Sequence, residues 1–211
     1  KKCYLKKPIC GLDKGVHFKL GKSNPSHQET IAMKNWDKIE VKLQDEDKAA
    51  LISLIKEFAE KDNKVIEVLN ARYIYQNDQV ARLQPYKERL TDFIWWDEDG
   101  DNAGSFEEII KDYQQAMPDD TEGLIALHLF ALETMREFLS DKGDDAAYYY
   151  GDEFHLAMID IVSACVSCFF GKPERYAKHR DFLVESTHEL NRSSNELGER
   201  LFNLIYQYED F

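Results

Sequence analysis

Five oxygen-bearing side chains between residues 97 and 108 have the types and the spacing of calcium ligands. They stand at the first, third, fifth, ninth and twelfth positions of that segment: Asp97, Asp99, Asp101, Ser105 and Glu108. Carboxylate and hydroxyl oxygens are ligands that Ca²⁺ prefers, and the backbone carbonyl of Ala103 would serve the seventh position. The segment therefore predicts a metal site, with calcium as its possible ion.

Over these twelve residues the chain resembles an EF-hand loop, which implies calcium binding between two helices. Asn102 stands where such a loop has glycine, and Gly104 stands where an apolar residue usually pairs with a second loop. No second segment of this kind occurs in the sequence. The alternative is an acidic connection in which Ser105 and Glu108 only form a capping box at the start of a helix.

A second group of residues has the composition of a protein interface. The segment AYYYGDEF, residues 147–154, combines three tyrosines with two acids. Tyrosine brings a large contact area at a small entropy cost, so it is common at interfaces. We expect a partner-binding surface formed by this segment and the aspartates of the loop: Tyr148, Tyr149, Tyr150, Asp152, Glu153, Asp97, Asp99 and Asp101. The alternative is that the tyrosines pack the start of a helix against its neighbour.

The residues Tyr149-Tyr150-Gly151-Asp152 follow an acidic turn and open a very apolar helix. In this feature, over about residues 148–170, the chain resembles helical bacterial immunity proteins of polymorphic toxin systems. The resemblance implies a protein that neutralises a cognate toxin by binding it directly.

The cysteines and histidines form no recognisable catalytic pattern. Cys165 and Cys168 have CxxC spacing inside an apolar run, where we expect buried core thiols and not a redox pair. A four-thiolate zinc site that adds Cys3 and Cys10 has no support from the spacing. We expect each histidine to lie in the core or at its rim.

Motifs for nucleotide or hydrolase chemistry are also missing from the sequence, which has no glycine-rich phosphate loop and no serine nucleophile elbow. An enzyme is therefore the less favoured class. The enzymatic alternative would use Asp152 and Asp160, which share the polar side of an apolar helix over residues 152–170.

The elements that position these residues are mostly helices. Apolar residues recur at helical spacing from residue 45 to the end of the chain, and predict a mainly α, multi-helix bundle of about eight helices. The predicted segments begin near Asp45 or Asp47 and cover 64–83, 85–96, 106–117 and 121–140. They continue with a helix from about Tyr148 or Asp152 to Phe170, and with stretches opening at Pro173 and Ser193. The helix over 152–170 is apolar on three sides, so we expect it at the centre of the core.

The first 43 residues differ from this pattern. Val16 to Leu20 and Ile39 to Leu43 alternate between apolar and polar residues, which predicts a small N-terminal β element. We expect a basic β-like element over residues 1–43, packed on an acidic helical domain over residues 44–211.

Charge separates the same two regions. The 211 residues carry 27 Lys and Arg against 40 Asp and Glu, a net charge of −13. Residues 1–42 hold 10 basic and 4 acidic side chains, a net +6, which leaves −19 for the remainder. This balance excludes nucleic acid as the main partner and favours a basic protein. Neither a secretory signal nor a membrane span stands out, so we expect a soluble, cytoplasmic protein.

Overall fold

The computed structural model describes residues 36–95, 105–142, 146–193 and 195–208, with side chains described over 36–95, 105–142, 155–192 and 196–208. This part of the chain is helical and contains no strand, so the prediction of a mainly α protein is confirmed. Its elements are α2 (Trp36–Asp45), α3 (Lys48–Lys61), α4 (Asn63–Leu69), the π-helix η1 (Asn70–Ile74), α5 (Gln79–Ile94), α6 (Phe106–Ala116), α7 (Thr121–Lys142), α8 (Ala146–Phe169), α9 (Pro173–Ser193) and α10 (Asn195–Tyr206).

The predicted strand over Ile39 to Leu43 is wrong, because these residues lie in α2. Five residues are too few to distinguish the two-residue period of a strand from the 3.6-residue period of a helix. Trp36, Ile39 and Leu43 also follow the spacing of three and four residues that places side chains on one face of a helix. The other predicted strand, Val16 to Leu20, lies outside the described residues.

The chain divides into two units, residues 1–55 and 56–211. In the first unit, α2 and the start of α3 bury no side chain. The second unit contains the hydrophobic core, to which the helices from η1 onward contribute buried residues. The core is therefore confined, among the described residues, to the second unit.

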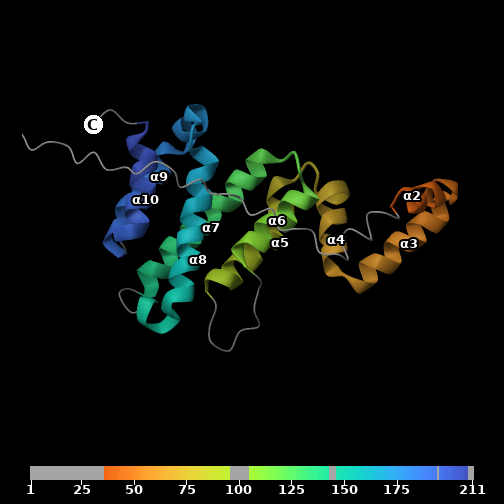
Figure 1. Cartoon of the computed structure of the whole chain (residues 1–211), viewed down its shortest axis with the longest axis horizontal. Coiled ribbons are helices and arrows are strands. Elements are labelled where there is room, and N and C mark those ends of the chain that lie inside the picture. The colour runs from red at the N-terminus through yellow and green to blue at the C-terminus, as the bar shows by residue number, and fades with distance from the viewer. Residues whose placement is uncertain (1–35, 96–104, 143–145, 194, 209–211) are drawn as a thin grey trace, which may run out of the picture. The chain divides into compact units, whose positions relative to one another are not determined.

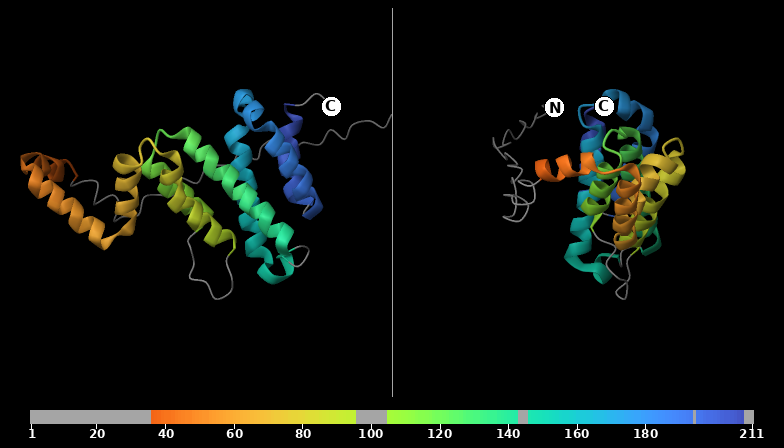
Figure 2. Two further views of the ribbon diagram at one scale, coloured as in Figure 1. Left: turned by 180° about the vertical axis from the view of Figure 1, so that it is seen from behind. Right: turned by 90° about the vertical axis from the view of Figure 1, so that its right-hand side faces the viewer.

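Helix α7 shares the centre of that core with α8. It contacts α5, α6, α8 and α9, and Figures 1 and 2 show it between the α5–α6 pair and the α8–α10 group. Leu127, Leu132 and Phe138 of α7 are fully buried, as are Val162 and Phe169 of α8. The expectation of a central α8 is thus met only in part, since α7 packs against as many helices.

Local signals fix several helix ends. Ser105 opens α6 with the predicted capping box: its hydroxyl accepts from the Glu108 N–H at 3.2 Å, and the Glu108 carboxylate accepts from the Ser105 N–H at 3.1 Å. Gly171 ends α8 with a φ of 70°, a left-handed conformation that glycine adopts without steric cost. Pro173 then stands in the first turn of α9.

The predicted helix boundary at Pro85 is wrong, because Pro85 lies inside α5. The chain breaks earlier, at Tyr75 to Asp78, and the Asp78 side chain caps α5 by accepting from the Ala81 N–H at 3.0 Å. The cap satisfies a free backbone donor at the start of α5. Burial of Leu83, Tyr86 and Leu90 on the same helix offsets the cost of a proline in its interior.

Tyr208 fastens the end of α10 to the turn between α8 and α9. Its hydroxyl donates to the Phe169 carbonyl at 2.8 Å and accepts from the Lys172 N–H at 2.8 Å. Its ring stacks on that of Tyr176, with centroids 4.6 Å apart. The Lys172 N–H also donates to the Phe169 carbonyl at 2.9 Å, so the Tyr208 hydroxyl adds a second bond to each group of the turn that ends α8.

No described helix combines the length and the apolar content needed to span a lipid bilayer.

Candidate partner-binding site

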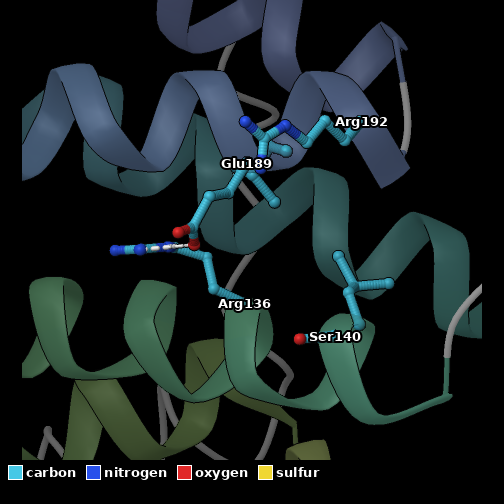
Figure 3. A pocket seen from close by; sticks show the side chains of 6 residues that line it. Arg136, Ser140, Glu189 and Arg192 are labelled. Atoms are coloured by element: carbon cyan, nitrogen blue, oxygen red, sulfur yellow. Dashed lines mark hydrogen bonds and ion pairs between the residues drawn. The ribbon is translucent and has the colours of Figure 1, made fainter.

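Two adjoining pockets lie on the surface where α7 faces α9, and together we call them the α7/α9 groove. Figure 3 shows the one that Arg192 helps to line. The larger part of the groove has a volume of about 450 Å³. Three residues line both pockets, namely Arg136, Ser140 and Glu189, and six more line one of them: Glu133, Glu137, Leu139, Asp141, Leu190 and Arg192. Most of these side chains are polar or charged, so the groove suits a charged ligand more than an apolar one.

Arg136 forms the floor of the groove. Its Nε donates to the Glu189 carboxylate at 2.7 Å, as drawn in Figure 3, and its Nη1 donates to the Glu133 carboxylate at 2.7 Å and to the Ser186 hydroxyl at 3.1 Å. The guanidinium also lies over the Phe182 ring, 5.4 Å from its centroid. Arg136 is only 9% exposed. The contacts meet the requirement that a buried charge be paired, and they join α7 to α9.

The rim of the groove is acidic. Glu133, Glu137 and Asp141 are spaced four residues apart on α7, so they form one row along the helix. Glu189 faces them from α9, and the Glu133, Asp141 and Glu189 side chains are between 43% and 58% exposed. Like charges four residues apart destabilise a helix by about 0.2–0.5 kcal/mol per pair. Resident cations offset part of this repulsion, because Arg136 pairs with Glu133 and Glu189, and Lys142 pairs with Asp141 at 3.3 Å.

The predicted partner-binding residues are described only in part. Asp97, Asp99 and Asp101 lie outside the described residues. The backbone of residues 148–153 belongs to α8, whereas the side chains of Tyr148, Tyr149, Tyr150, Asp152 and Glu153 lie outside the described part. Asp141 of the groove stands at the start of the same acidic stretch of sequence, residues 141–153.

The predicted calcium ligands that are described, Ser105 and Glu108, bond to each other in the capping box of α6. This is the arrangement that the alternative to a calcium loop requires. Among the described side chains, no three His, Cys, Asp or Glu residues are grouped so that they could hold a metal ion.

The predicted core role of the cysteines is confirmed for Cys165, which is buried in α8. Burial raises the pKa of its thiol, and that of the half-buried Cys168, above the usual range. His128 is also a core residue, since it is buried and its Nδ1 lies 2.7 Å from the Leu124 carbonyl. Asp160, named for the enzymatic alternative, is exposed on α8.

A second charged cluster, around Asp120, is closed to ligands by its own bonds. The carboxylate of Asp120 accepts from the Tyr113 hydroxyl at 2.7 Å and from the Gly123 N–H at 2.8 Å, and it pairs with Arg82. Arg82 also donates to the Gln76 carbonyl at 2.8 Å. Burial alone would raise the pKa of Asp120, but the bonds from Tyr113, Gly123 and Arg82 hold it below the usual value. This cluster joins the starts of α5 and α7 to α6 and is structural.

The sequence reasoning missed the groove. The four-residue spacing of Glu133, Glu137 and Asp141 was available in the sequence as a signal. The sequence gives no signal for the contribution of α9, because Arg136 and Glu189 are 53 residues apart along the chain. No family model matches this chain, and no curated protein and no solved structure matches it either.

Proposed function

We propose that this protein is a non-enzymatic acidic binding protein that takes a basic segment of a protein partner into the α7/α9 groove. The single observation behind the proposal is the row formed by Glu133, Glu137 and Asp141, with Glu189 opposite. Carboxylates spaced along one helix complement a strand or helix that bears several Lys or Arg side chains, since such pairs steer association and select the partner.

A toxin of the nucleic-acid-degrading kind fits this description of the partner. Such a toxin must be basic to bind phosphate groups, and an acidic protein that covers the basic surface would neutralise it. The net charge of −19 over residues 43–211 and the resemblance of residues 148–170 to immunity proteins favour this class. The protein would then act by occlusion and would need no catalytic group.

The groove is tested with the double variant Glu137→Lys, Asp141→Lys in the full chain, against a basic protein encoded beside it. Reversing two rim charges is expected to weaken binding by about tenfold or more, because attraction becomes repulsion. Isothermal titration calorimetry measures the change. The matched control is Glu88→Lys, Asp92→Lys, which makes the same charge change at the same spacing on the exposed side of α5.

Equal loss of affinity in the two double variants would mean that only the total charge matters, and the groove would be the wrong site. The toxin class has its own test. If the neighbouring genes form a metabolic operon and none encodes a basic protein, the immunity function is wrong.

A calcium-binding loop over residues 97–108 is the second candidate. In its favour, α5 ends at Ile94 and α6 begins at Phe106, so helices flank the loop as calcium loops of this kind require. Calcium titration followed by the fluorescence of Trp95 and Trp96 tests it. Glu108→Gln keeps a capping side chain but removes the twelfth ligand, so it should abolish any response. An unchanged signal at millimolar calcium in the unaltered chain rejects this candidate.

A further inference from the structure

A separate pocket lies at the junction of α6, α7, α8 and the start of α9, and we call it the α7/α8 pocket. It shares no lining residue with the α7/α9 groove. Its volume is about 460 Å³, and sites for small molecules have ~300–1,000 Å³. No Asp or Glu is among the described residues that line it, although the chain has 40 acids against 27 bases. The pocket is therefore free of the negative charge that prevails elsewhere in the chain.

Four of the side chains that line the pocket are apolar and continue the hydrophobic core. Ile125 is a buried core residue, and the half-buried Leu124, Ala164 and Cys168 pack against the core. A ligand that covers these side chains removes apolar area from water, which favours binding. The pocket therefore suits a ligand with an apolar body.

The two charged side chains of the pocket are both cations. Lys172 directly precedes α9 and Arg175 stands in its first turn, where the helix dipole adds positive potential. Within the described part of the chain, neither side chain has a hydrogen bond or an ion pair. Glu122, an acid near Arg175, is instead paired with Lys178 at 2.6 Å. Both cations are thus available to an anion.

The apolar and polar groups of the pocket lie close together. Burial raises the pKa of the Cys168 thiol, while the nearby charges of Lys172 and Arg175 act in the opposite direction. His128, which is only 5% exposed, also lines the pocket. Its Nδ1 lies 2.7 Å from the Leu124 carbonyl, which can only accept, so Nδ1 carries the proton and Nε2 stays an acceptor. The lining thus combines apolar, basic and acceptor groups.

We propose that the α7/α8 pocket binds a small organic carboxylate that has an apolar body. The carboxylate bonds to Lys172 and Arg175, since a guanidinium donates two parallel hydrogen bonds to such a group and an ammonium adds a second positive charge. The apolar body lies against Leu124, Ile125 and Ala164. This ligand is distinct from the basic partner proposed for the α7/α9 groove, which the two cations would repel.

Isothermal titration calorimetry of the full chain with octanoate, acetate and 1-octanol tests the two parts of the ligand. Octanoate has both parts, acetate has the charge alone, and 1-octanol has the apolar body alone. Octanoate should bind at least about tenfold more tightly than either of the others, because only octanoate satisfies both the cations and the apolar lining. No octanoate binding up to ~10 mM would overturn the proposal.

A matched pair of double variants tests the cations. Lys172→Gln, Arg175→Gln should raise the dissociation constant of octanoate by about tenfold or more, because the carboxylate loses its charged donors. Lys56→Gln, Lys111→Gln makes the same change in net charge at two exposed cations that do not line the pocket, and should leave the constant unchanged. Equal affinity in the two double variants would mean that octanoate responds only to total charge, and the pocket would be the wrong site.

Ser167→Phe tests the location without a change in charge. Ser167 is exposed, lines the pocket and bonds only to the Ser163 carbonyl of its own helix, so a phenyl ring there fills part of the pocket at little cost to the fold. Octanoate binding should be lost, and thermal unfolding shows whether the variant is folded. A folded Ser167→Phe variant that binds octanoate as tightly as the unaltered chain would place the ligand elsewhere and overturn the proposal.

Discussion

Individual polar side chains hold the second unit together at its helix junctions. Asp120 alone receives bonds from Tyr113, from the Gly123 backbone and from Arg82, so three helices depend on one carboxylate. Such a network is stable only while each buried member keeps its partner.

Asp120→Asn is therefore expected to lower the free energy of unfolding by about 2–3 kcal/mol, because it leaves the buried Arg82 without its counter-charge. Urea unfolding followed by circular dichroism measures the change. Asp119→Asn, at an exposed neighbour, is the control. A loss in Asp120→Asn no greater than in this control would show that the ion pair contributes nothing to stability.

His128 gives the fold a dependence on pH. Burial lowers the pKa of its imidazole, although its bond to the Leu124 carbonyl acts in the opposite direction. The unfolded chain, with a histidine pKa near ~6.5, then binds a proton that the folded chain does not. Stability should fall as the pH drops below about 6.5, until the folded-state pKa is passed.

His128→Leu removes this proton while keeping an apolar group against Phe106, so the stability of the variant should change less between about pH 7 and 5. Urea unfolding at a series of pH values in that range provides the comparison. If the free energy of unfolding changes equally with pH in the variant and in the unaltered chain, groups other than His128 cause the pH dependence.

At the scale of elements, the α9–α10 pair depends on a close approach at one glycine. A Cβ atom on Gly198 would lie 2.8 Å from the Asn191 Cα and still closer to its side chain. Figure 2 shows the two helices side by side. Side-chain motion can relieve only part of this clash, because the Cα atom belongs to the backbone.

Gly198→Ala is thus expected to destabilise the protein by about 1–3 kcal/mol, whereas alanine normally stabilises a helix relative to glycine. Thermal unfolding measures the change: a lower midpoint temperature in Gly198→Ala supports the close approach, and a higher one contradicts it. Adding Asn191→Ala should recover only part of the lost stability. Full recovery would mean that the Asn191 side chain, and not the backbone of α9, limits how closely α10 can approach.

Helix positions are the part of the fold that the sequence predicts best, because the signals that start and stop a helix are local. The capping box at Ser105, the stop at Gly171 and the start at Pro173 depend on residues within one turn. The errors also have local causes. The alternation of Ile39 to Leu43 was too short to exclude a helix, and Pro85 lies inside a helix that begins at the Asp78 cap.

The candidate site was less accessible to sequence reasoning because it needs two helices. The row on α7 is visible in the sequence, but its contact with Glu189 depends on how α9 packs. The prediction of partner-binding acids near helix ends concerns residues 97–101 and 148–153, and it stays a prediction.

At the scale of the whole molecule, charge is distributed unequally along the chain. A net +6 over residues 1–42 precedes −19 over the remainder. Potentials of this kind act at distances of about 10 Å at 0.1 M salt and raise association rates with an oppositely charged partner.

The association rate with a basic partner should therefore fall by about tenfold or more between low salt and ~0.5 M salt, while the dissociation rate changes less. Stopped-flow fluorescence provides both rates. A rate constant that is independent of salt would mean that apolar contacts, and not the acidic surface, guide the encounter.

The buried position of Arg136 has a consequence for selectivity. Its guanidinium is a resident cation, and Glu133 and Glu189 are already largely neutralised by it. Asp141 is also paired, with the Lys142 ammonium at 3.3 Å. Under the proposed function, an ammonium group of a basic partner would therefore gain most at Glu137, which is exposed. Under the proposed function, affinity should then depend on where a partner places a single Lys or Arg relative to Glu137, and two peptides of equal total charge would bind with different affinities.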